Sequence, residues 1–182
     1  GGSGSGTVLE TRNKVKAENG IYHSAYDCVN AIDGASDLYY LTDDFYFEVL
    51  KTGQYITKDK SSAGNGASVA VIFYYKDFSF FTAGDLTTSS EASLMRNETL
   101  PEVTLYKASH HGSNGSSSQE LLDTLNPKAV AISASIAGKY GSTPSSTPNK
   151  NYTYNLDGKT GHPYEDAIGR IYKAPRISEN LN

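Results

Sequence analysis

Residues 65–85, NGASVAVIFYYKDFSFFTAGD, carry the strongest structural signal in this sequence. After them the chain passes through a segment of helical composition into a short apolar run that leads to SHHGS at residues 109–113. Asp85 stands where one apolar run ends, and His110 and His111 stand where the next one ends. Because an α/β scaffold gathers residues from the C-terminal ends of its strands at one edge of the sheet, these three are candidate metal ligands.

Two nearly continuous apolar and aromatic runs make up this signal. Val69–Tyr75 and Phe78–Thr82 are separated by the polar pair Lys76–Asp77, which predicts a β-hairpin. Runs without polar alternation are typical of strands that are covered on both faces. We therefore expect the hairpin to lie in a sheet with a layer on each side.

Weaker β signals surround the hairpin. Residues 37–53 are typical of two strands around the polar turn Thr42–Asp44. Further strands are expected at Val103–Lys107, at Ala129–Ser133 and, near the end of the sequence, at RIYKA (residues 170–174).

Helical patterns alternate with these strands. They lie at residues 7–20, 25–33, 89–96, 117–126 and 163–169. Within the fourth pattern, Ser117 and Glu120 have the spacing of a capping box, and three leucines supply a buried stripe. Alternating strands and short helices predict an α/β fold with a mixed sheet and flanking helices, formed by residues 7–182.

Composition narrows the possible functions. The 182 residues include 16 Lys and Arg against 20 Asp and Glu, a formal net charge of −4, with no long run of either sign. This balance does not favour nucleic acid or an anionic membrane as a partner. No apolar run approaches the ~20 residues of a membrane span. The polar, weakly charged composition suits an extracellular or cell-surface protein.

Three further features have structural interpretations. Residues 1–6, GGSGSG, have the composition of a flexible linker, and we expect them to be a linker remnant outside the domain. The single cysteine, Cys28, excludes an internal disulfide and is expected to be an inert buried residue. His23 has no partner at ligand spacing and is expected to be structural or on the surface.

Carboxylate and imidazole together are ligands for zinc or manganese. Asp85 could bridge two cations through its two oxygens, while His110 or His111 supplies a neutral imidazole. A metal held in this way lowers the pKa of a bound water to ~7. The alternatives are that Gly-Asp forms only a turn, and that adjacent histidines on an extended backbone point to opposite sides. In the second case one histidine at most binds the metal directly, unless the chain bends there.

The serine-rich loop after the histidines leads into a helix N-terminus. Its backbone N–H groups, together with the hydroxyls of Ser113 and of residues 116–118, could bind an anion such as a phosphate oxygen. A capped turn without a ligand would have the same sequence pattern.

Taken together, these motifs resemble a known family. The matching segments are FFTAGD (residues 80–85), Glu91 in a helix, LYKASHHGSNGSSSQELLDTLNPKAVAIS (105–133) and GHPYEDAIGRIY (161–172). They resemble the C-terminal half of metallo-β-lactamase-fold hydrolases, in the branch that includes the extracytoplasmic domain of bacterial competence (DNA-uptake) proteins. The resemblance extends from about Tyr46 to Ala174.

The resemblance implies an αββα sandwich with a centre of two Zn or Mn ions at its edge, in a bacterial protein outside the cytoplasm. In such proteins the Gly-Asp aspartate bridges the metals, a role that falls on Asp85. His110 and His111 would lie in or beside the metal shell. His162 would lie near the same pocket, as a ligand, as a contact to substrate phosphate, or as neither. The implied catalytic residues are Asp85, His111 and His162, and Ser113 and His162 would contact substrate.

One family motif has no counterpart in this sequence. The principal metal motif, His-x-His-x-Asp-His, belongs to the N-terminal half of the fold and does not occur here. We therefore expect the sequence to be the C-terminal half of the domain and its partner to be a complementary chain that carries the motif. Without that half, one face of the sheet would be left exposed.

Two functions remain open. The first is a metal-dependent hydrolase, of phosphodiesterase type, in which metal-bound hydroxide attacks a small-molecule or other phosphodiester; nucleic acid is possible but is not favoured by the charge. The second is a catalytically silent surface or binding module that keeps the fold without a complete metal centre. Its 14 tyrosines would then serve recognition of a partner.

Overall fold

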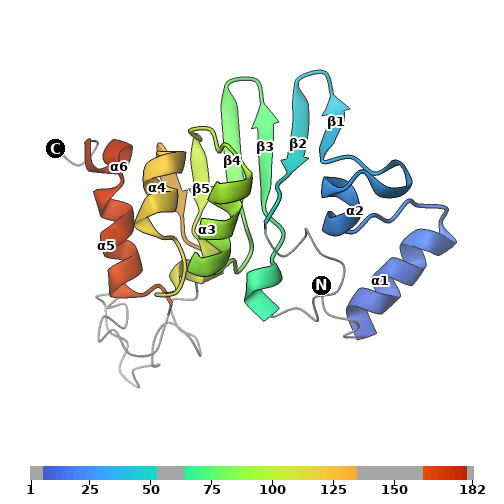
Figure 1. The fold of residues 1–182 in the computed structure, drawn as a ribbon, viewed down its shortest axis with the longest axis horizontal. Coiled ribbons are helices and arrows are strands. Elements are labelled where there is room, and N and C mark those ends of the chain that lie inside the picture. Colours follow the sequence, from blue (N-terminus) through green and yellow to red (C-terminus); the bar gives the residue numbers. More distant parts are fainter. Residues whose placement is uncertain (1–5, 53–63, 135–161, 180–182) are drawn as a thin grey trace, which may run out of the picture.

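The structure is a computed structural model that describes residues 6–52, 64–134 and 162–179 (Figure 1). The strands are β1 (Leu38–Thr42), β2 (Phe45–Val49), β3 (Val71–Tyr75), β4 (Phe78–Thr82), β5 (Leu105–Lys107) and β6 (Ala129–Ala131). The helices are α1 (Gly6–Ala17), α2 (Ala25–Val29), α3 (Thr88–Asn97), α4 (Gln119–Leu125), α5 (Glu165–Lys173) and α6 (Pro175–Glu179). Short 3-10 turns lie at Ile32–Gly34, Gly64–Ala67 and Ser109–Gly112.

All six strands belong to one mixed sheet in the order β1-β2-β3-β4-β5-β6. Neighbouring strands from β1 to β4 pair antiparallel, whereas β5 pairs parallel to β4 and to β6. The expected α/β architecture with a mixed sheet and flanking helices is therefore confirmed. Each parallel step needs a crossover, and α3 and α4 supply the two crossovers, so β4 and β5 both end at the same edge of the sheet.

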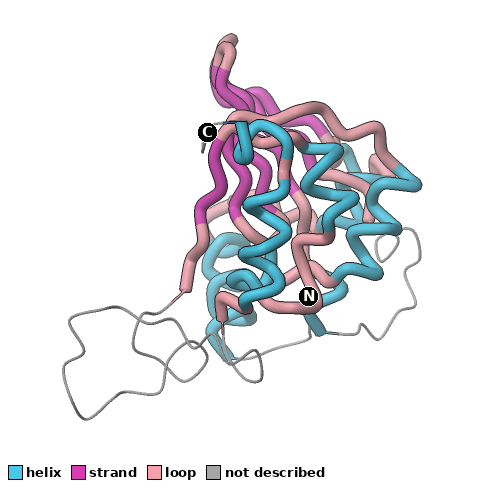
Figure 2. Tube along the Cα trace, turned by 90° about the vertical axis from the view of Figure 1, so that its left-hand side faces the viewer, coloured by secondary structure: helices cyan, strands magenta, loops and turns pink. Residues whose placement is uncertain are grey.

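The helices α3, α4 and α5 cover one face of the sheet (Figure 2). The strands present the side chains of Ile72, Phe81 and Tyr106 to them, each with no exposed surface. The helices contribute Leu94, Leu121, Leu122, Leu125 and Ile171 to the same core. This packing fixes both crossovers against the sheet.

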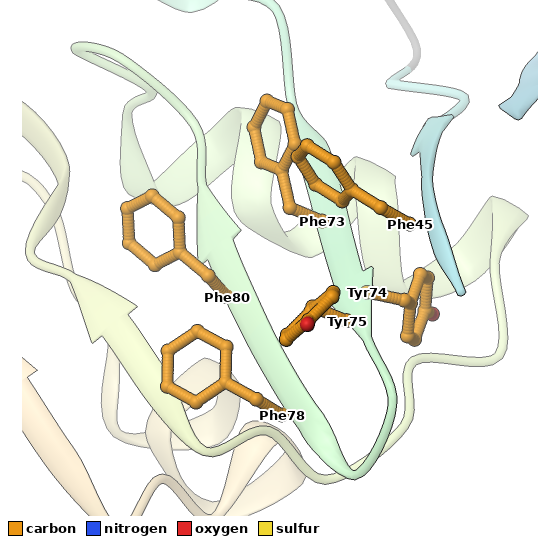
Figure 3. A pocket seen from close by; sticks show the side chains of 6 residues that line it. All are labelled: Phe45, Phe73, Tyr74, Tyr75, Phe78 and Phe80. Carbon is orange, nitrogen blue, oxygen red and sulfur yellow. The ribbon is translucent and has the colours of Figure 1, made fainter. Parts of the chain in front are cut away.

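The opposite face of β2, β3 and β4 is aromatic (Figure 3). We call Phe45, Phe73, Tyr75, Phe78 and Phe80 the aromatic face, because cross-strand pairing places Phe73 beside Phe80 and places Tyr75 between Phe45 and Phe78. The Phe73 and Phe80 ring centroids lie 6.2 Å apart. Tyr75 and Phe78 are 51% and 43% exposed, so the described residues leave this face open to solvent.

Nearer to β1, the helix α2 packs on the sheet. Cys28 is buried with Val49 and Ala35, and the Tyr39 and Phe47 rings pack against them. The Cys28 Sγ lies 3.6 Å from the Tyr39 hydroxyl. The expectation that Cys28 is a buried residue is confirmed, and the described parts of the chain hold it as a free thiol.

Some sequence-based expectations are wrong. RIYKA (residues 170–174) is not a final strand. Residues 170–173 end α5, because Ala167 and Ile171 recur at helical spacing and are both buried. The hairpin is not covered on both faces by the described residues. The helix α4 is capped by Ser118, whose hydroxyl accepts from the Leu121 N–H, rather than by Ser117.

Among the helices within residues 6–52, 64–134 and 162–179, none has the apolar length that crossing a bilayer requires. Of the expected linker at residues 1–6, only Gly6 is among the described residues, and it begins α1.

The core packing can be tested at Leu122, which has no exposed surface. We expect Leu122→Ala to lower the free energy of unfolding by about 2–5 kcal/mol, because the substitution loses buried apolar area and leaves a cavity. The matched control is Leu41→Ala, at a side chain that is 57% exposed, with an expected change within about 0.5 kcal/mol. Urea denaturation measures both, and equal losses would contradict the helix packing described above.

Candidate functional site

Asp85 lies in a tight turn that follows β4. The turn closes through a hydrogen bond from the Leu86 N–H to the Ala83 carbonyl oxygen (3.0 Å). Gly84 has φ +54°, and a Cβ there would lie 3.2 Å from the Ser68 side chain. The Asp85 N–H donates to the Ser68 hydroxyl (3.1 Å). These contacts hold the Asp85 side chain at the edge of the sheet where β4 and β5 end. About 38% of its side-chain surface stays exposed.

His110 and His111 form a bend that follows β5. Both have left-handed backbone conformations, with φ values of 48° and 57°. Two adjacent residues on an extended strand would point to opposite sides, but this bend brings the two ring centroids to 6.4 Å from each other. The His110 N–H donates to the Gly84 carbonyl oxygen (3.0 Å), which joins the bend to the turn that carries Asp85.

His162 joins the other two histidines from the segment before α5. Its ring centroid lies 5.0 Å from that of His110 and 6.3 Å from that of His111. The segment is held by a hydrogen bond from the Tyr164 N–H to the Gly112 carbonyl oxygen (2.8 Å). Gly112 itself has φ +77°, and a Cβ there would lie 2.9 Å from Pro163. The structure therefore brings together the predicted residues Asp85, His110, His111 and His162, although 77 residues separate the first from the last (85 to 162).

The hydrogen bonds of His111 assign its tautomer. Its Nδ1 lies within hydrogen-bond distance of the Ser133 carbonyl oxygen, which can only accept, so Nδ1 carries the proton. In the neutral ring, Nε2 then carries the lone pair. That atom faces Asp85 Oδ1 at 3.4 Å. Because a carboxylate oxygen also only accepts, this contact becomes favourable when a cation, or an added proton on the ring, lies between the two atoms.

The His111–Asp85 pair fits two ligands of one metal ion. Ligands bonded at ~2.0–2.1 Å to a tetrahedral Zn²⁺ lie roughly 3.3 Å apart, close to the 3.4 Å between His111 Nε2 and Asp85 Oδ1. A histidine that ligates through one ring nitrogen commonly donates from the other to a backbone carbonyl, as His111 does to Ser133. Carboxylate and imidazole suit zinc and manganese.

The described residues do not supply a complete metal site. No group of three or more His, Cys, Asp or Glu side chains among them is arranged to hold one ion. His110 turns its Nε2 toward the Asn65 side-chain nitrogen (3.1 Å) rather than toward the His111–Asp85 pair. The pair fits a metal as part of a donor set, and further ligands have to come from other residues or from a partner.

The predicted anion site at the start of α4 is filled by the protein itself. Both Glu91 carboxylate oxygens accept backbone N–H groups there, from Ser117 (2.7 Å) and from Ser118 (2.8 Å). The Ser116 hydroxyl donates to the Ser109 carbonyl oxygen (2.7 Å). The loop N–H groups that we expected to meet a phosphate therefore already have partners.

Ser113 lies at the start of this loop and is half-buried. Its N–H donates to the His110 carbonyl oxygen (2.9 Å), and its hydroxyl accepts from the Gly115 N–H (3.3 Å). Its role in substrate binding stays a prediction. His23, which follows α1, is half-buried and takes no part in the cluster.

Burial raises the pKa of the Glu91 carboxyl. Its side chain has no exposed surface, and desolvation raises the pKa of the carboxyl above its ordinary value, although the two N–H groups and the charge of Arg170 act in the opposite direction. Arg170 donates to the carbonyl oxygens of Asn114, Ser116 and Ser117 at 2.9–3.0 Å. Sequence reasoning missed Arg170 because it assigned this residue to a strand.

Comparison with known proteins adds no family assignment. No protein-family model matches the chain, and a search of curated proteins gave no match. The functional role of the cluster therefore has to be inferred from its own geometry.

The Glu91 carboxyl predicts a pH dependence of stability. A carboxyl whose folded pKa is raised contributes stability below its unfolded pKa, and this contribution is lost as pH rises through the folded value. We therefore expect the free energy of unfolding of the wild type, relative to Glu91→Gln, to fall as pH rises above about 4.5, the ordinary value. Urea denaturation from pH 4 to pH 8 measures this difference. The exposed Glu120→Gln is the control, and a wild-type curve parallel to that of Glu91→Gln would refute the prediction.

Proposed function

We propose that this chain supplies the aspartate-and-histidine part of a metal-dependent hydrolase of phosphodiesterase type. The observation that carries the proposal is the His111–Asp85 pair, in which two lone-pair atoms face each other at 3.4 Å while the other His111 nitrogen is bound to a backbone carbonyl. Such a pair favours a cation between its members. The rings of His110 and His162, with centroids 6.4 and 6.3 Å from that of His111, support the same function.

Each residue of the cluster has a proposed role. Asp85 and His111 would hold a zinc or manganese ion, and the family resemblance gives Asp85 the further role of ligand to a second one. His110 lies next to His111 and faces Asn65, and it would become a ligand if its ring turned from Asn65 toward the His111–Asp85 pair. His162 contacts substrate phosphate beside the metals. Ser113 contacts substrate from the loop that follows the histidines.

The metals would lower the pKa of a water so that hydroxide is present at neutral pH, and would polarise a phosphoryl oxygen. The protein residues then have three tasks: Asp85 and His111 fix the metals, the Ser133 carbonyl keeps the His111 tautomer, and His162 orients the phosphate. Resemblance to bacterial extracytoplasmic domains supports a location outside the cytoplasm or on the cell surface.

The proposal includes a partner. A complete centre needs more ligands than the described residues provide, and a complementary chain with the His-x-His-x-Asp-His motif would provide them. The aromatic face supports such a partner, because an apolar surface of this kind is stabilised when another layer covers it. In an αββα sandwich that layer is the second sheet.

A second candidate function is a binding module without catalysis. It is favoured by the incomplete donor set and by the same aromatic face, which could bind a partner of another kind. The two functions differ in their metal chemistry, so metal binding separates them.

Metal binding tests the role of Asp85 and His111. We expect the chain to bind Co²⁺, a spectroscopic substitute for zinc, with d–d absorption in the visible range. Asp85→Asn and His111→Asn should each lower the affinity about 10-fold or more, whereas His23→Asn, outside the cluster, should leave it unchanged. Equal affinities in all four proteins would exclude the proposed ligands, and absence of binding in the wild type would favour the binding module.

Native mass spectrometry and metal analysis of the protein purified from its natural source test whether a partner chain is present. We expect a second polypeptide and two equivalents of zinc or manganese, together with hydrolysis of bis(p-nitrophenyl) phosphate. Phe78→Glu, on the aromatic face, should release the second polypeptide, because it introduces a charge into the covered surface. The control is Leu41→Glu on the exposed end of β1. A single metal-free polypeptide without turnover would argue against the hydrolase.

A further inference from the structure

The histidine bend has a backbone that needs support. His110 and His111 are left-handed at φ 48° and 57°, Gly112 follows at φ 77°, and Ser117 is also left-handed at φ 52°. Non-glycine residues rarely adopt this conformation, and they keep it only where the surrounding structure holds them in it. The contacts that hold the bend therefore also decide where the two imidazoles lie.

Glu91 holds the far end of the loop. Its carboxylate accepts the Ser117 and Ser118 N–H groups at 2.7 and 2.8 Å. Arg170 binds the opposite side of the same two peptide groups through the Ser116 and Ser117 carbonyl oxygens, and it also binds the Asn114 carbonyl oxygen. The buried Glu91 carboxyl group and the Arg170 guanidinium thus fix the N–H and C=O groups of one short segment.

The Tyr106 hydroxyl joins this far end to the histidines. It lies 2.8 Å from the Ser117 hydroxyl and accepts the Ser109 N–H at 3.0 Å. Ser109 is the residue immediately before His110. Tyr106 has no exposed surface, and burial raises its pKa to about 12, so the hydroxyl keeps its proton.

These contacts form one continuous path, Glu91–Ser117–Tyr106–Ser109–His110, in which every member except the histidine is fully buried. We infer that Glu91 is a positioning residue for His110 and His111: it sets the imidazole geometry through the loop backbone without touching either ring. The expected effect of Glu91 on metal affinity rests on the function proposed above. Its expected effect on the positions of the histidine rings does not depend on that function.

The experiment compares Glu91→Gln with a control that weakens the same helix. Leu94→Ala creates a cavity beside α3, where Leu94 is fully buried, but removes no side-chain hydrogen bond to the loop, because leucine has no polar side-chain group. The first readout is the chemical shift of the His110 and His111 ring Cε1–H signals, assigned with His110→Asn and His111→Asn. The second is the Co²⁺ affinity.

We expect Glu91→Gln to shift both ring signals and to lower the Co²⁺ affinity by about 10-fold, the usual effect of losing support behind a ligand. Leu94→Ala should lower the unfolding midpoint while leaving the ring signals in place and the affinity within about 2-fold. Tyr106→Phe removes the link in the middle of the path and should shift the ring signals as Glu91→Gln does. If Glu91→Gln does not fold, the ring signals of Tyr106→Phe decide whether this path positions the histidines.

Unmoved ring signals in Glu91→Gln and Tyr106→Phe would overturn the inference. Equal ring shifts in Leu94→Ala would also overturn it, because they would show a general effect of stability. If neither the wild type nor any variant binds Co²⁺, the proposed hydrolase function fails. The histidine ring signals still decide the role of Glu91 in that case.

Discussion

The parallel pairing of β5 with β4 and β6 is the constraint on which the rest of the structure depends. Parallel neighbours require a crossover, and the two crossovers place α3 and α4 on one face of the sheet. The chain therefore leaves β4 and β5 at the same edge. Asp85 and the two histidines meet there because of topology, and the turn at Gly84 and the bend at Gly112 bring the side chains into contact.

Much of this arrangement could be predicted from the sequence. Apolar runs interrupted by Lys76–Asp77 and by Asp43–Asp44 placed the hairpins, since strand periodicity and turn residues are local signals. Asp85, His110 and His111 could be identified because they end apolar runs, and His162 could be identified only through the family resemblance. The specific αββα sandwich stays a proposal.

The remaining features depend on contacts between distant residues, which local patterns do not encode. The sequence RIYKA favours a strand because Ile and Tyr have high β propensity. In the structure its buried residues instead recur at helical spacing, and Arg170 reaches a loop 53 residues earlier in the chain (170 to 117). Glu91 reads as a favourable charge in the first turn of a helix, whereas in the structure it is a buried acceptor for another segment. The loop around Ser113 could have bound an external anion, and an internal carboxylate takes that place.

The left-handed backbone of the histidine bend limits which residues can occupy it. Among side chains with a Cβ, Asn, Asp and His tolerate this conformation best, and β-branched residues tolerate it worst. At positions 110 and 111, Asn or Asp would therefore keep the backbone of the bend, whereas Val or Ile would both remove the imidazole and strain the loop. The left-handed backbone of the bend therefore favours a small group of side chains, and the same side chains have the lone pairs that bind metal ions.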